Sequence, residues 1–502
     1  MATHTANEES PLSLRHLSLW LRVREFAVPP SMIETATARR LAGDWGGACA
    51  AAGIDVDLNL RSAARTHGRE LAARIRADLR HLAPDLLRWH MPRIAPDGLL
   101  RPGLTISLAR YDIPGPVGAR PVHLVARTLP AWADAGQRIS LALWAGSPDD
   151  AGARRHPHPH PNPRFRLDLH RHLWDARRTD ELRIRSGAEP PPADGAPATA
   201  PEVLGLVRQG LRCAVDRWAA EAGILLRADG PSARTFTVRL GSRQRLDLDL
   251  DLDLDLDLDL DLDLDLDLDR DLDRDRHLDL PADGDGNGPP VLRISTASTH
   301  PGARPLPILP DAATWLLPDL ELLRTGSLDA DRLHPLVASA LVPDRAPTAP
   351  SLIPDRPGRP HLVACRGAQH RIGLVDGVLA PLDHDPAEIR REELLVALTG
   401  TPLPCLQAID EAHRRPDCLT GVRERLDHGD TAGALAVVES LLGPDALLRD
   451  GALRDELEAA ARQRITYGLF RAGLIGPGPD RMRPGPRRTH GHRSHPRHTA
   501  GH

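Results

Sequence analysis

Lysine is absent from the 502-residue chain, and all 64 basic side chains are arginine. Two kinds of enzyme chemistry are thereby excluded, because a Walker A loop needs a lysine on its phosphates and a pyridoxal enzyme needs one for its Schiff base. Aromatic residues make up only 3% of the chain, which disfavours the stacking platforms of nucleic-acid-binding proteins. The abundance of Ala, Arg, Gly, Pro and Asp indicates a GC-rich bacterial genome.

Cysteine is rare, and its spacing is uninformative. The five cysteines form no CxxC pair and no zinc-ribbon spacing, and their odd number fits reduced thiols in a cytoplasmic protein. The first residues, MATHTANEESPLSLRHL, lack the charged and apolar segments of a signal peptide. No run approaches the roughly 18 apolar residues of a membrane span. We therefore expect a cytoplasmic protein with no membrane partner.

Common catalytic signatures are also missing. The chain has no GxSxG, no HExxH, no GxGxxG after a strand and no kinase motif set. Nothing in the sequence calls for a cofactor, so we expect none.

The most conspicuous feature present is a run of alternating Leu and Asp between Arg245 and Pro281. A helix does not fit, because alternation scatters Leu around its whole circumference. A strand has the right period of two, but at about 3.3 Å per residue the run is far longer than ordinary strands, and one face would be a row of repelling carboxylates. Arg270, Arg274 and Arg276 also stand in the Leu register. We interpret the run as a disordered insertion produced by repeat slippage, with a polyanionic interaction segment as the alternative.

The opening of the chain predicts a β-α-β-α order. Alternating Leu17, Leu19, Leu21 and Val23 indicate a strand. Ser31 and Glu34 form a capping-box pattern, which predicts a helix reaching about Ala52. The alternation in 54–60 predicts a second strand, and 62–92 predicts a long helix that Pro84 kinks or divides.

The middle of the chain is expected to be rich in strands. Five alternating segments lie between residues 94 and 186, and the Pro/Ala-rich stretch 187–201 has the composition of a linker. An amphipathic helix is predicted over Val203–Trp218. Residues 234–241 and 290–297 then read as two strands of one sheet, with the Leu-Asp run inserted between them.

Towards the C-terminus the pattern changes to a β-meander followed by helices. Residues 359–385 predict the meander, with Asp376-Gly377 as a hairpin turn. Asp385 and Pro386 predict the start of a helix that ends at Gly400, and 403–475 predicts three or four short helices.

The predicted fold class is α+β, with an N-terminal α/β segment, a β-rich middle carrying the low-complexity insertion, and a C-terminal helical domain. The expected organisation is a disordered 1–10, an α/β to β-rich domain 11–186, a linker 187–201, an α+β segment 202–310 with a disordered insert 246–290, a mixed segment with the meander 311–400, a helical domain 401–476 and a disordered basic His/Arg tail 477–502.

The meander carries the densest group of reactive residue types: Cys365, His370, Asp376, Asp383, His384 and Asp385. A Cys-His pair could act as a nucleophile with its base, and the carboxylates with His384 could hold a metal or transfer protons. A structural reading competes, because Asp376 fits a turn, Asp385 fits a helix cap and Cys365 fits a buried strand. We keep Cys365, His370, Asp383 and His384 as catalytic candidates.

A second group consists of histidines in a Pro-rich stretch. Imidazoles there could chelate Ni, Cu or Zn, although a Pro-rich loop offers little to fix their positions. The candidate metal ligands are His156, His158, His160, His170 and His172.

These observations lead to one functional expectation and two rivals. The expectation is a non-catalytic scaffold or adaptor that binds another cytoplasmic protein. The first rival is a hydrolase-type enzyme with its site in 365–385. The second is nucleic-acid binding through arginine, for which the net charge of +6 in residues 481–502 is the main support.

Overall fold

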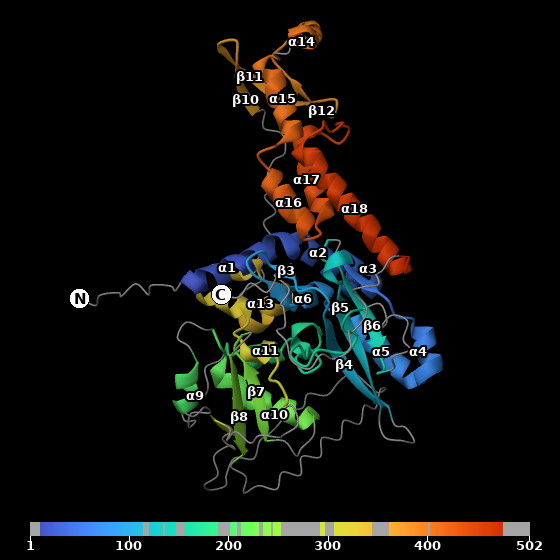
Figure 1. Ribbon diagram of the computed structural model, residues 1–502, viewed down its shortest axis with the longest axis vertical. Coiled ribbons are helices and arrows are strands. Elements are labelled where there is room, and N and C mark those ends of the chain that lie inside the picture. Colours follow the sequence, from blue (N-terminus) through green and yellow to red (C-terminus); the bar gives the residue numbers. More distant parts are fainter. Residues whose placement is uncertain are drawn as a thin grey trace, which may run out of the picture. The chain divides into compact units, whose positions relative to one another are not determined.

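The computed structural model describes residues 11–113, 120–133, 136–146, 156–188, 201–207, 212–229, 234–241, 244–252, 292–296, 306–343, 361–399 and 402–474. Two compact units are present, one made of Met1–Ala188 with Leu317–His502 and the other of Glu189–Leu316. Both contain helices and sheets, so the chain is a mixed α+β protein, as predicted (Figure 1). Among the described residues, no helix combines the length and apolarity needed to cross a membrane. The C-terminal tail and residues 253–290 of the insert lie outside the described ranges.

The first unit opens with helices, so the predicted strand at its start is wrong. Helix α1 (Pro11–Arg22) continues into a π-helical turn, Val23–Ala27. The alternating leucines lie on a helix that packs against Trp89. The ring centroids of Trp20 and Trp89 are 5.1 Å apart, and the Arg24 guanidinium lies 3.9 Å from the centroid of the Trp89 ring. Tertiary packing of this face outweighed the period of two.

The helix predicted from the capping box is divided and starts elsewhere. Helix α2 (Pro30–Leu41) has Pro29 at its N-cap without a side-chain cap, so the Ser31–Glu34 box does not form. Helix α3 (Trp45–Ala51) follows a break at Gly43, where φ is +77°. Asp44 caps α3 by accepting a 2.8 Å hydrogen bond from the Gly47 amide.

The second predicted strand is shorter than expected, and the long helix is three helices. Strand β1 (Ile54–Val56) is followed by α4 (Leu60–His67), α5 (Arg69–His81) and α6 (Pro84–His90). Asn59 caps α4 by accepting from two backbone amides at 3.0 Å each. Pro84 begins α6, so the predicted division there is confirmed.

The main sheet has the order β1-β6-β5-β4. Its strands β4 (Thr105–Ile113), β5 (Arg120–Thr128) and β6 (Ile139–Trp144) are antiparallel, and β1 adds to β6 in parallel. A small hairpin precedes them, β2 (Arg93–Ile94) with β3 (Leu99–Leu100). Three of the five predicted strands of the 94–186 region are thus confirmed.

The two strands predicted within 165–186 are wrong. That segment contains a 3-10 turn at Arg171–Leu173 and helix α8 (Glu181–Arg185). Five of its apolar residues are buried in the main core: Phe165, Leu167, Leu173, Trp174 and Leu182. Trp174 donates a 3.0 Å hydrogen bond to the Leu167 carbonyl. Helices α12 (Pro318–Arg324) and α13 (Pro335–Leu341) complete the same core from far along the sequence.

The second unit pairs a three-stranded antiparallel sheet with helices. The predicted helix 203–218 is wrong in its bounds, since α9 covers Pro201–Leu206 and α10 covers Trp218–Asp229. The sheet order is β7-β8-β9, with β7 at Thr235–Arg239 and β9 at Leu292–Thr296, as expected. A short helix α11 (Asp311–Thr314) closes the described part of this unit.

The central strand of this sheet is the beginning of the Leu-Asp run. Strand β8 (Arg245–Leu252) takes up residues 246–252, which differs from the expectation of disorder from residue 246. Leu248 and Leu250 are buried, whereas Asp247 and Asp249 accept 2.6 Å hydrogen bonds from the hydroxyls of Thr237 and Thr235. The neighbouring threonines satisfy the carboxylates that made a strand look unfavourable.

The C-terminal part of the first unit agrees closely with the sequence prediction. The meander consists of β10 (His361–Cys365), β11 (Ala368–Val375) and β12 (Val378–Pro381), and α14 (Pro386–Thr399) follows it. Positive φ angles at Asp376 and Gly377 (49° and 79°) confirm the predicted hairpin turn. Four further helices follow: α15 (Pro404–Arg414), α16 (Leu419–Asp427), α17 (Thr431–Leu442) and α18 (Ala452–Ala472).

Candidate functional site

The chemistry-bearing residues of the C-terminal segment converge where the meander meets α15. Cys365 ends β10, and tight turns with positive φ bring β11 back along it. His370 on β11 pairs with Val363, two residues before Cys365, so His370 and Cys365 share one face of the sheet. Helix α15 begins at Pro404 and packs against the meander, which brings Cys405 to the same place.

Three of these side chains form a compact cluster. Cys365, His384 and Cys405 each offer one potential ligand atom, and the three atoms lie within 4.8 Å of one another. The thiol-bearing residues are only 1% and 0% exposed, and the His384 side chain is 3% exposed. Two of the three were expected in one site from the sequence. Cys405 was not.

The two ring nitrogens of His384 have different surroundings. Nδ1 lies 3.5 Å from a carboxylate oxygen of Glu388, which is in the first turn of α14. The other oxygen of Glu388 accepts a hydrogen bond from Arg366. Nε2 is buried and has no hydrogen-bond partner among the described residues. A carboxylate on one nitrogen with the other left open is the arrangement that orients a histidine towards a metal.

His370 lies beside this cluster. Its ring stacks on that of His384, with centroids 4.3 Å apart and planes inclined by 13°. Its Nδ1 is likewise buried without a hydrogen-bond partner among the described residues. Two adjacent imidazoles with unused buried nitrogens are costly unless a ligand uses them.

The carboxylates of the predicted cluster are committed to structure. Asp383 accepts from the Arg371 backbone amide and guanidinium, both at 2.7 Å, and these hydrogen bonds lower its pKa to about 2. Asp385 caps α14 by accepting from the Ala387 amide at 2.8 Å. Asp376 occupies the hairpin turn. None of the three points to acid-base chemistry.

The Cys405 thiol is a poor nucleophile in this environment. Burial raises the pKa of Cys405 to about 11, and the adjacent Cys365 adds to the effect. A thiol with such a pKa is protonated at neutral pH, whereas a catalytic cysteine needs a thiolate. The cluster therefore suits metal binding better than nucleophilic catalysis.

The histidines of the Pro-rich stretch are spread over a different part of the first unit. His156 Nε2 lies 2.9 Å from the Thr128 carbonyl oxygen, and His170 Nδ1 lies 2.9 Å from that of Arg166. Within the described ranges, the meander group is the one that brings three potential ligands together. The structure accordingly does not gather three of His156, His158, His160, His170 and His172.

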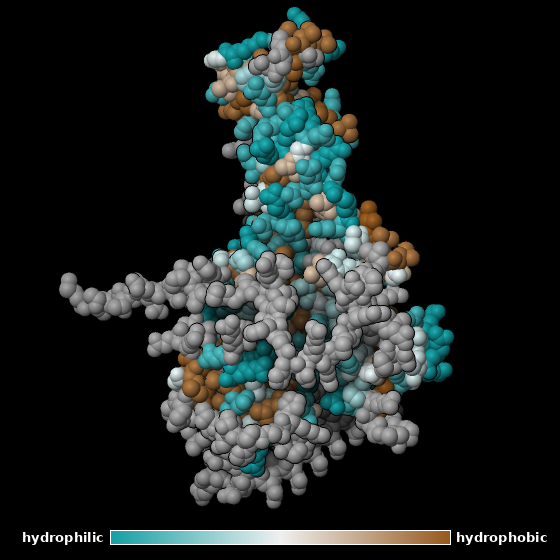
Figure 2. Space-filling view, viewed as in Figure 1, coloured by the Kyte–Doolittle hydropathy of each residue, from teal (hydrophilic) through white to brown (hydrophobic). Residues whose placement is uncertain are grey.

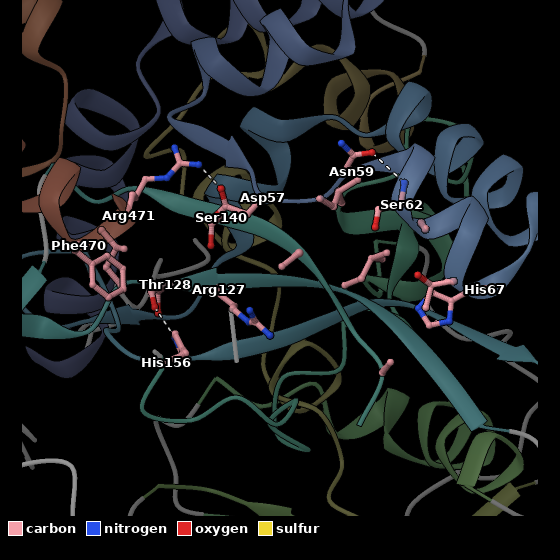
Figure 3. A pocket seen from close by; sticks show the side chains of 17 residues that line it. Asp57, Asn59, Ser62, His67, Arg127, Thr128, Ser140, His156, Phe470 and Arg471 are labelled. Atoms are coloured by element: carbon pink, nitrogen blue, oxygen red, sulfur yellow. Dashed lines mark hydrogen bonds and ion pairs between the residues drawn. The ribbon is translucent and has the colours of Figure 1, made fainter. Parts of the chain in front are cut away.

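A cleft of about 670 Å³ lies on the main sheet beside α4 and the end of α18 (Figure 3). Its polar groups hold the fold together. Asn59 caps α4, Arg471 pairs with Asp57, and His156 contacts the Thr128 carbonyl. Because these polar side chains of the cleft are engaged in structural contacts, they do not form a recognisable group of catalytic residues.

Sequence reasoning missed Cys405 because it searched for ligands close in sequence. The 40-residue separation from Cys365 matches no short metal-binding motif. The available signal was a cysteine in the first turn of a helix, directly after Pro404 and one helix beyond the meander.

No protein-family model, curated protein or solved structure matches the chain.

Proposed function

We propose that the protein is a non-catalytic adaptor that binds another protein of the cytoplasm through helix α14. The observation that supports this most directly is an exposed apolar face on that helix. Leu394, Leu395 and Leu398 are 69%, 46% and 85% exposed. Their spacing of i, i+1 and i+4 places them on one side of the helix. Figure 2 shows hydrophobic surface in the region of α14.

Exposed leucines in such a group are unusual on a monomer. Single surface apolar residues need no explanation, but clustered ones mark interaction sites. Arg366 holds the first two turns of α14 through ion pairs with Glu388 and Glu392. A helix held at one end that presents a leucine face fits the helix-in-groove mode of recognition. The partner we propose therefore offers an apolar groove.

The enzyme alternative has less support from the geometry. A hydrolase built on the 365–385 cluster needs a thiolate or a free base. Its carboxylates Asp383 and Asp385 are bound by Arg371 and by the Ala387 amide at the start of α14, so neither is free to act as the base. The adaptor proposal needs neither group.

Arginine-mediated nucleic-acid binding is also less favoured within the described residues. Several surface arginines are paired with carboxylates, including Arg414 with Asp410 and Arg454 with Glu458. Paired guanidinium groups contribute little to a phosphate-binding stripe, since the neighbouring carboxylates cancel the local charge.

The test compares two variants of the full chain in its native host. Leu394→Glu with Leu398→Glu places charge on the proposed face, and Leu447→Glu is a matched control at a residue 89% exposed before α18. Quantitative mass spectrometry of captured proteins should show a stoichiometric partner with the wild type and with the control, reduced at least tenfold with the double variant.

Three outcomes would contradict the proposal. The same protein could be captured equally by all three forms. The double variant could lower the melting temperature of the isolated protein, which would mean that its own chain covers the face. The double variant could have half the particle mass of the wild type in light scattering, which would mean that a second copy of the chain binds the leucine face of α14.

A further inference from the structure

We propose that Cys365, His384 and Cys405 bind one zinc ion, with His370 as the fourth ligand, and that this ion is structural. The proposal goes beyond adaptor function and does not depend on it. It assigns a role to the buried His370 and His384 nitrogens that have no hydrogen-bond partner among the described residues, which neither catalysis nor the hydrophobic core explains.

The spacing of the three ligand atoms is close to that of a zinc site. With Zn–S near 2.3 Å and Zn–N near 2.0 Å, tetrahedral geometry places ligand atoms about 3.3–3.8 Å apart. The atoms of Cys365, His384 and Cys405 lie within 4.8 Å of one another. A contraction of at most about 1 Å would bring the three atoms to the spacing of a zinc site.

The imidazoles provide an independent argument. His384 Nε2 and His370 Nδ1 are both buried without hydrogen-bond partners among the described residues. Glu388 beside His384 Nδ1 favours the tautomer in which Nε2 carries a lone pair. Stacking places His370 beside His384, so rotation of its side chain is what would bring its Nδ1 to the same ion as a fourth ligand.

The ligand set selects the metal class. Two thiolates with two imidazoles make a soft tetrahedral set that suits zinc, and it contains no carboxylate or water-rich side that would suit magnesium or calcium. Binding converts both thiols to thiolates, so two protons leave as two Zn–S bonds form. No electron transfer is involved, and no other reactant is needed.

The small core of this segment explains why a metal would be needed. Among the described residues, its buried apolar cluster consists of Cys365, Leu403 and Cys405, with Val363 and Leu406 packed against it. Small modules with so little buried apolar area usually need a metal or disulfides for stability. The proposed ligands come from β10, β11, the β12–α14 connection and α15, so one ion would tie these four parts together.

The test uses the full chain, reduced and purified without a histidine tag. Zinc content is measured by plasma mass spectrometry after dialysis, and cobalt is titrated as a spectroscopic substitute that reports thiolate ligation by its charge-transfer absorption. Wild type should bind one zinc per chain and show the cobalt–thiolate band. Cys213→Ser, a half-buried thiol of the other unit, is the matched control and should behave identically.

Variants at the site separate ligation from folding. Cys405→Ser should lose the equivalent of zinc, while Cys405→His, which keeps a ligand, should retain one zinc with a weaker thiolate band. His370→Ala should weaken zinc binding at least tenfold. Retention by Cys405→His excludes the explanation that any change at this buried position merely unfolds the module.

Clear results would overturn the proposal. One is a wild type with five titratable thiols and no cobalt–thiolate band. Another is an unchanged band in Cys405→Ser, and an unchanged affinity in His370→Ala would overturn the assignment of the fourth ligand. These readouts are independent of the α14 variants, so failure of zinc binding and failure of partner binding can be told apart.

Discussion

Arg88 on α6 donates a 2.9 Å hydrogen bond from Nη2 to the backbone carbonyl of His428, a residue 340 positions further along the chain. The same guanidinium donates to the carbonyls of Ala27 and Gln137 at 2.9 and 2.6 Å. Its side chain is buried, at 1% exposure. One arginine thus ties the N-terminal helices of the first unit to the end of α16.

We expect Arg88→Met to destabilise the first unit by about 3 kcal/mol or more, because three buried carbonyls lose their donor at about 1–3 kcal/mol each. Urea unfolding followed by tryptophan fluorescence measures the loss. Arg110→Met is the control, since Arg110 is exposed and pairs with Asp112 on the surface, and its cost should stay below about 1 kcal/mol. Equal losses in the two variants would show that the buried bonds do not hold the segments together.

The first unit should lose stability as the pH falls from about 6.5. Burial, reinforced by Arg93 and Arg88, lowers the pKa of His428 to about 3. The unfolded chain, with a pKa near 6.5, therefore takes up a proton that the folded chain does not, and stability falls by about 1.4 kcal/mol per pH unit from this residue alone. The stability that depends on neutral His428 is fully present above pH 6.5 and is lost progressively as the pH falls to about 3.

The measurement compares the free energy of unfolding of wild type and His428→Gln at pH 7 and pH 5. The free energy of unfolding of the wild type, relative to that of the variant, should fall by roughly 2 kcal/mol from pH 7 to pH 5, because glutamine at position 428 does not take up a proton. Leu426→Ala, a buried apolar change in the same helix, should show a difference from wild type that does not vary with pH. A constant difference for His428→Gln would contradict the lowered pKa.

The C-terminal half of the fold was predictable because its signals are local. Asp385, Pro386 and the Asp376-Gly377 turn specify a cap and a hairpin within a few residues, and the structure follows them. At the start of the chain the signal was ambiguous, since Leu17, Leu19 and Val23 fit both periods over a short window. Contacts with Trp89 on α6 favour the helix, and a short stretch of sequence does not reveal contacts between residues so far apart in the chain.

The candidate site was half predictable for the same reason. Cys365, His370 and His384 lie within 20 residues, so a sequence cluster was visible. Cys405 comes from a helix that reaches the cluster only through packing of α15 on the meander. Asp383 was predicted as a catalytic candidate, but it pairs with Arg371 across the hairpin. The sequence alone does not distinguish such a structural carboxylate from a catalytic one.

The beginning of the Leu-Asp run should be essential to the second unit. Leu248 is fully buried between β7 and β9, so Leu248→Ala should cost about 2–5 kcal/mol. Leu246→Ala in the same strand is the control, because Leu246 is half-buried and should cost less than half as much. Hydrogen exchange of peptides from β7 and α10 reports the loss within this unit. Equal hydrogen-exchange protection of these peptides in wild type and Leu248→Ala would mean that residues 246–252 belong to the disordered insert and not to the sheet.

The proposed zinc site predicts a metal affinity that depends on pH near neutrality, unlike that of a carboxylate site. Cysteine thiols are largely protonated below about pH 8.5, so zinc must displace the proton of Cys405 when it binds. The apparent affinity should therefore weaken at least tenfold for each unit that the pH is lowered between 8 and 6, since one proton is released from this thiol alone. Competition with a chromogenic chelator at several pH values measures the slope. Carboxylates with pKa values near 4 stay ionised over that range, so a flat profile would mean that the metal is held by carboxylates and not by these cysteines.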